Sequence, residues 1–136
     1  MTVHFVGAGP GAADLLTLRA ASLLAAADVV LYPGTYLDAA VLSHCPTARH
    51  VDTQSLDLDR ITAVMVEAAA EGLDVVRLTS GDPSLYSALA EQTARLDAAG
   101  VAWDVCPGVP AYAAAAALVD RKSTRLNSSH TDISRM

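Results

Sequence analysis

Short apolar segments alternate with longer segments of helical periodicity over most of the chain. Four of five such short segments are rich in valine or leucine, the one over residues 48–51 is weaker, and each is followed by glycine, proline or polar residues. Short apolar runs that turn signals bound are typical of buried β-strands. The pattern therefore predicts strands over residues 3–7, 28–32, 48–51, 73–78 and 101–105.

Between these segments, leucine and alanine recur at the spacing of one helix face. The expected helices begin after Asp14, cover residues 37–44, 60–71 and 84–99, and follow Pro110. An aspartate before a helix can accept a hydrogen bond from a backbone amide of the first turn. We therefore expect Asp14 to cap the first helix, and either Asp57 or Asp59 to cap the helix over 60–71.

The regular alternation of strand and helix predicts the fold class. We expect an α/β fold with a mostly parallel five-stranded sheet and helices on both of its faces. Ligands of such folds bind beyond the carboxyl ends of the strands. Three loops at these ends, 7–11, 79–83 and 107–110, are rich in glycine and proline. A structural turn needs one such residue, so the three clusters together favour a binding site.

The first of these loops, GAGPGA at residues 7–12, allows two interpretations. It satisfies the GxGxxG/A pattern of dinucleotide sites, and Asp28 lies at the right distance along the chain for a ribose contact. However, Asp28 begins the second strand, and the residues at the carboxyl end of that strand, Tyr32 and Pro33, carry no carboxylate. Pro10 has no N–H to give to a phosphate. A rigid turn with few donors suits an uncharged or cationic ligand better.

Composition and charge narrow the class of protein. The chain of 136 residues is 52% hydrophobic, which suits one domain with a sizeable core, and its net charge of −6 argues against a nucleic-acid surface.

The two cysteines, Cys45 and Cys106, form no CxxC pair, and we expect them to be small buried residues rather than metal ligands. The chain enters a strand directly, with no signal peptide, so a cytoplasmic location is expected.

Four segments together resemble a known family. They are VHFVGAGPGAADLLTLRA, DVVLYPGTY, RLTSGDPSLYSALAEQ and CPGVPAYAAAAA, and they occur in the order typical of the tetrapyrrole (corrin and porphyrin) methyltransferases. Members of this family take a methyl group from S-adenosylmethionine. Within the family, LYPGTYLDAAVLSHCP and SGDPSLYSALAEQ are most similar to the branch that methylates carbon 11 of precorrin-4 in cobalamin biosynthesis. The resemblance implies a tetrapyrrole substrate, either precorrin-4 or cobalt-precorrin-4.

The resemblance also implies a domain organisation. Family members have two α/β domains with the cofactor between them, and they form homodimers. Residues 1–120 resemble the first, cofactor-binding domain, and a second family domain is absent from this sequence. Residues 121–136 differ sharply in composition, because KSTRLNSSHTDISRM has four serines and no alanine. We interpret 121–136 as a disordered or artefactual tail.

Matching motifs assign residues to the expected site. The resemblance implies no metal and assigns no catalytic residue. It places Gly34, Thr35 and Tyr36 in a trough for the tetrapyrrole. The expected contacts of S-adenosylmethionine are Pro10, Ser80, Gly81, Asp82, Leu85, Pro110 and Ala111. Two rival interpretations remain, a Rossmann-type oxidoreductase domain that binds NAD(P) and a non-catalytic fragment.

Several residues of chemical interest have simpler interpretations. Asp82 is more readily a helix cap or a loop-fixing residue than a base. His4 alternates with apolar strand residues, which favours a structural role, and the spacing of His44 and His50 around a cysteine fits no standard metal site. Arg77 lies within a predicted strand. It is either a buried, paired charge near the site or a residue at the edge of the sheet.

Overall fold

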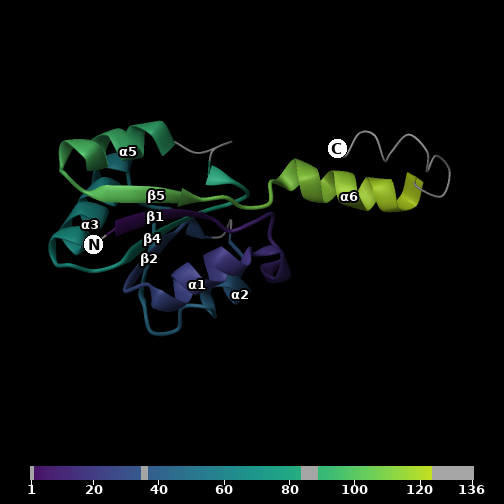
Figure 1. The fold of residues 1–136 in the computed structure, drawn as a ribbon, viewed down its shortest axis with the longest axis horizontal. Coiled ribbons are helices and arrows are strands. Elements are labelled where there is room, and N and C mark those ends of the chain that lie inside the picture. The colour runs from purple at the N-terminus through teal and green to yellow at the C-terminus, as the bar shows by residue number, and fades with distance from the viewer. Residues whose placement is uncertain (1, 35–36, 84–88, 124–136) are drawn as a thin grey trace.

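The computed structural model describes residues 2–34, 37–83 and 89–123 (Figure 1). Its centre is a five-stranded sheet in the order β3-β2-β4-β1-β5, in which every neighbouring pair is parallel. The predicted fold class and all five predicted strands are confirmed, with shifts of one or two residues at their ends. The strands are β1 (Thr2–Gly7), β2 (Val29–Tyr32), β3 (Arg49–Asp52), β4 (Val75–Thr79) and β5 (Ala102–Cys106).

Helices connect successive strands. A 3₁₀ turn, η1, precedes the first of them, and the last helix, α6, continues past residue 120. Of the helix expected over 84–99, residues 84–88 lie outside the described part, as does the expected tail from 124 onward. The elements are η1 (Ala13–Leu15), α1 (Leu18–Ala26), α2 (Ala39–Leu42), α3 (Leu58–Ala70), α5 (Leu89–Ala98) and α6 (Ala111–Ser123). Within the described residues, no helix combines the length and the apolar character that a bilayer crossing requires.

The helix caps differ from the prediction at one position. Asp57 caps α3, since its carboxylate accepts a hydrogen bond from the Arg60 amide at 2.8 Å. The prediction for Asp14 is wrong. Asp14 lies inside η1, and the cap of α1 is Thr17, whose hydroxyl accepts from the Ala20 amide at 3.1 Å. The 3₁₀ turn after the glycine loop displaces the start of the helix, and a threonine is an equally good acceptor there.

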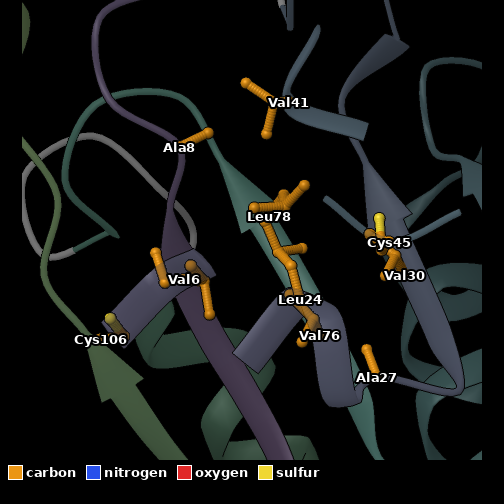
Figure 2. Packing of buried hydrophobic residues seen from close by; sticks show 11 residues of the cluster. Val6, Ala8, Leu24, Ala27, Val30, Val41, Cys45, Val76, Leu78 and Cys106 are labelled. Atoms are coloured by element: carbon orange, nitrogen blue, oxygen red, sulfur yellow. The ribbon is translucent and has the colours of Figure 1, made fainter. Parts of the chain in front are cut away.

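Each face of the sheet carries its own hydrophobic layer. Figure 2 shows the layer beneath α1 and α2, where Leu24 and Val41 pack with Val6, Val30 and Leu78 from three strands. On the opposite face, the side chains of α3 and α5 cover a second layer. Parallel strands that are buried on both faces are typical of α/β folds. The second layer contains Val3, Phe5, Val29, Leu31, Ile61, Met65, Ala68, Val75 and Leu96.

The connections create a topological switch point at the centre of the sheet. The chain leaves β1 through α1 on one face to reach β2, and it leaves β4 through α5 on the other face to reach β5. The strands β1 and β4 are neighbours. Because α1 and α5 lie on opposite faces, the loops that follow these two strands turn in opposite directions (Figure 1). Ligands of open α/β sheets bind at such switch points, beyond the carboxyl ends of the strands.

Candidate cofactor-binding site

The loops after β1 and β4 are joined by their backbones. The Gly9 amide donates to the Gly81 carbonyl at 3.2 Å, and the Gly81 amide donates to the Gly9 carbonyl at 2.8 Å. The Ala8 amide donates to the Thr79 carbonyl at 2.7 Å. Two glycine-rich segments that lie about seventy residues apart in the sequence therefore form one unit at the switch point.

The third loop, after β5, packs against this unit without any side chain between them. A Cβ atom placed on Gly7 would lie 2.5 Å from the Gly81 carbonyl oxygen and 2.7 Å from the Gly108 Cα. A Cβ on Gly108 would collide with the same carbonyl oxygen. Gly7 and Gly108 are thus required because three backbones meet at one point. This role was not predicted, and the only signal for it in the sequence was a glycine in each of the three loops.

This contact brings most of the predicted cofactor residues together. Pro10 and Pro110 are half-buried in the first and third loops, and Ser80 is exposed in the second. Gly81 is buried at a φ of +66°, which a glycine adopts without strain, and Asp82 is half-buried beside it. The backbone of Ala111 begins α6 at the end of the third loop. Leu85 lies outside the described residues.

Of the three predicted substrate residues, only Gly34 belongs to the described part of the chain. Gly34 follows β2 at the same edge of the sheet, half-buried and at a φ of +60°. Because β2 adjoins β4 on the side away from β5, Gly34 is separated from the third loop by the first two. Thr35 and Tyr36 lie outside the described residues.

The glycine loops offer little to a phosphate. The amides of Ala8, Gly9 and Gly81 are already bonded to carbonyls of the facing loop, and Pro10 has no amide hydrogen. A pyrophosphate site needs free backbone amides at this position. The three loops present carbonyl oxygens, proline rings and a few polar side chains instead.

Asp28 lies at the amino ends of the strands, on the opposite side of the sheet from the loops where a ribose contact is expected. It precedes β2, and its Oδ2 accepts a hydrogen bond from the Asp74 amide at 2.8 Å, just before β4. A strand of four residues places this edge roughly 13 Å from the loops at the carboxyl ends. Asp28 therefore joins the starts of two strands and does not belong to the site.

Arg77 is a buried cation beneath the second loop. Its side chain is 8% exposed on β4, a central strand, so it is not an edge residue. Nη1 donates to the Leu78 carbonyl at 2.9 Å and Nε donates to Oε1 of Gln92 at 3.3 Å. In the described part of the chain, the structure shows no carboxylate paired with it. Burial lowers the pKa of Arg77 to about 10, which leaves it charged at neutral pH.

Cys45, His50 and His4 contact other residues of the fold. Both thiols are buried, and burial raises the pKa of Cys45, so its thiol stays protonated. Nε2 of His50 lies 3.6 Å from the Cys45 sulfur and 2.8 Å from the Cys45 carbonyl oxygen. Nδ1 of His4 contacts the Asp104 carboxylate at 2.6 Å across the β1–β5 pair. Among the residues described, no three histidine, cysteine or acidic side chains are grouped for a metal ion.

An apolar groove lies beside the third loop. It has a volume of about 340 Å³ and runs between η1 and α6. In Figure 1, α6 extends away from the sheet, and its side chains Tyr112, Leu118 and Val119 are all more than half exposed. The groove is lined by Leu15, Val109, Ala113, Ala114, Ala117 and Leu118.

Comparison with known proteins yields one consistent result. Residues 2–133 match the family described as tetrapyrrole (corrin/porphyrin) methylases. The chain is 56% identical over 125 residues to a precorrin-4 C(11)-methyltransferase of Rhodococcus erythropolis, covering 91% of this chain and 50% of that protein. It is 36% identical over 125 residues to a cobalt-precorrin-4 C(11)-methyltransferase of Priestia megaterium, covering 91% of this chain and 48% of that protein. The chain thus spans about half the length of these curated relatives.

Solved structures agree with the sequence comparison. The X-ray structure of a cobalamin biosynthetic enzyme, a cobalt precorrin-4 methyltransferase, matches with a TM-score of 0.84 and 36% identity, over 88% of this chain and 50% of that one. A uroporphyrin-III C-methyltransferase from Thermus thermophilus, solved in complex with S-adenosyl homocysteine, matches with a TM-score of 0.70 and 37% identity, over 81% of this chain and 46% of that one.

Proposed function

Because the chain belongs to the tetrapyrrole (corrin/porphyrin) methylase family, we propose that it is the cofactor-binding half of an S-adenosylmethionine-dependent C-methyltransferase. The observation that carries this proposal is the convergence of loops 7–11, 79–83 and 107–110 at one point of the sheet edge. The amides of Ala8, Gly9 and Gly81 are bonded to carbonyls of the facing loop, which suits a cofactor that has no phosphate.

The proposed substrate is precorrin-4, methylated at carbon 11 in cobalamin biosynthesis. Support comes from the degree of identity to two kinds of relative. The chain is 56% identical to the precorrin-4 enzyme of Rhodococcus erythropolis and 36% identical to the cobalt-precorrin-4 enzyme of Priestia megaterium. This difference favours the metal-free substrate over the cobalt-containing one.

The cofactor supplies an electrophilic methyl group on a sulfonium ion when it is bound. Under the proposal, Pro10 and Pro110 form apolar walls for it, and Ser80 and Asp82 provide polar groups for its amino-acid end. The three loops hold one another rigidly, so they can align the methyl group with the ring carbon and keep water away. Alignment of this kind is worth on the order of 7–11 kcal/mol in ideal intramolecular reactions.

Calorimetric titration of the 136-residue chain tests the cofactor assignment. We expect heat on addition of S-adenosylhomocysteine and none on addition of NAD, because the amides of Ala8, Gly9 and Gly81 are already bonded to carbonyls of the facing loop and Pro10 has no amide hydrogen. Micromolar affinity is expected for a protein of the relatives' full length. Binding of NAD with no response to S-adenosylhomocysteine would establish the dinucleotide alternative instead.

Substitution of Asp28 distinguishes the two alternatives by a second route. Asp28→Ala is expected to leave the affinity for S-adenosylhomocysteine unchanged, since the residue lies at the opposite edge of the sheet. It should lower the free energy of unfolding by about 1 kcal/mol, because the Asp74 amide loses its acceptor. Asp28→Asn keeps an acceptor oxygen and should retain most of that stability. A sharp loss of ligand affinity in Asp28→Ala would contradict the proposed site.

A further inference from the structure

The loop that follows β4 is attached to the rest of the protein at both ends. It carries three of the predicted cofactor contacts, Ser80, Gly81 and Asp82. At its middle, Gly81 exchanges two backbone hydrogen bonds with Gly9. The path of residues 79–83 therefore depends on how the chain leaves β4 and on these bonds to Gly9.

Arg77 lies directly beneath this loop in an apolar environment. On the sheet, its register partners are Phe5 of β1 and Leu31 of β2, which are both fully buried. A guanidinium in such a layer loses its hydration, and an aliphatic side chain would avoid that cost. The presence of a charged group here indicates a role that an aliphatic residue could not fill.

The hydrogen bonds of Arg77 connect β4 to α5, the next helix that the structure describes after the loop. Nη1 donates to the carbonyl of Leu78 at the end of β4, and Nε donates to the side chain of Gln92 on α5. The guanidinium is planar, so the directions of its donors are fixed relative to one another. It can therefore set the distance and angle between the strand end and the helix that follows.

We propose that Arg77 is a positioning residue for the cofactor site, holding β4 and α5 in the arrangement that keeps Gly81 bonded to Gly9. The proposal rests on the proposed function for the identity of the ligand. Its structural part, the path of the loop after β4, is independent of that function.

Amide hydrogen exchange followed by NMR tests the structural part in the unliganded chain. Arg77→Met removes both hydrogen bonds while keeping a long apolar stem, and we expect the Gly81 amide to exchange about tenfold faster. The Val76 amide, inside the β1–β4–β2 ladder, reports general destabilisation and should change much less. Arg77→Lys keeps the charge without the planar fork and should give an intermediate rate.

Arg95 provides the matched control. It lies on α5 as Arg77's partner Gln92 does, but it is ion-paired with Asp59 on the surface. Arg95→Met should leave the Gly81 rate unchanged. Equal acceleration of the Gly81 and Val76 amides in Arg77→Met would overturn the proposal, because Arg77 would then be a residue of general stability. If Arg77→Met does not fold, Gln92→Ala decides the matter by the same two amides.

Ligand affinity tests the functional part. Arg77→Met should weaken binding of S-adenosylhomocysteine about tenfold, while Arg95→Met should bind as the unchanged chain does. Unchanged affinity together with an accelerated Gly81 amide would overturn the role in cofactor binding. If the unchanged chain binds no S-adenosylhomocysteine, the proposed function fails, and the exchange rates alone still support or overturn the role in loop positioning.

Discussion

Gly7→Ala is expected to lower the free energy of unfolding by about 3 kcal/mol or more and to weaken S-adenosylhomocysteine binding at least tenfold. The added Cβ would lie 2.5 Å from the Gly81 carbonyl oxygen and 2.7 Å from the Gly108 Cα. Both neighbours are backbone atoms, so no side-chain rotation can relieve the overlap. The loops would have to separate, and the bonds between Gly9 and Gly81 would be lost.

Urea unfolding and calorimetric titration measure the two effects. Gly100→Ala is the matched control, because Gly100 has a φ of +73° but open space around its Cβ position. That variant measures backbone strain alone, for which about 1–2 kcal/mol is expected, and it should bind the ligand normally. If Gly7→Ala costs no more than Gly100→Ala, the three loops do not meet as described.

Phe5→Ala is expected to reduce stability by about 3–5 kcal/mol, the usual cost of removing a large aromatic side chain from a core. Phe5 is fully buried on β1, and its ring meets that of Trp103 edge-on at a centroid distance of 6.3 Å. Its removal would leave a cavity beside Arg77, which occupies the paired position on β4. Because a small domain has a total stability of about 5–15 kcal/mol, this variant should be close to unfolding.

The protein has a single tryptophan, so the fluorescence of Trp103 can follow the unfolding transition. Phe5→Leu keeps most of the buried volume and should cost clearly less than Phe5→Ala. Trp103→Ala, followed by circular dichroism, should also cost less, since Trp103 is 36% exposed. Equal costs for Phe5→Ala and Phe5→Leu would show that the core around Phe5 is loosely packed.

The fold could be predicted from the sequence to a large extent. The strands, the helix over residues 60–71 and a cap for it at Asp57 or Asp59 follow from local periodicity and local hydrogen bonding, which depend on neighbouring residues only; the structure selects Asp57. The prediction failed for the cap of α1, because two residues near the start of that helix can serve as a cap. Asp14 and Thr17 are both good caps, and only the 3₁₀ turn between Ala13 and Leu15 decided in favour of Thr17.

The sequence located some features of the candidate site and left others open. The glycine and proline clusters and the resemblance to a family pointed to three loops that the structure brings together, and the position of Asp28 at a strand start is confirmed. The roles of Gly7 and Gly108 in backbone packing could not be read in this way. The sequence also left open whether Arg77 lies in the sheet's interior or at its edge.

By itself, the sequence determined which segments form strands and helices, which loops follow strands, and which family the chain resembles. The tertiary structure decided the strand order β3-β2-β4-β1-β5. Parallel strands pair across long stretches of chain, so no local pattern encodes which ones become neighbours. That order makes β1 and β4 adjacent, brings Gly9 to Gly81, and buries Arg77 beneath the loop that follows β4.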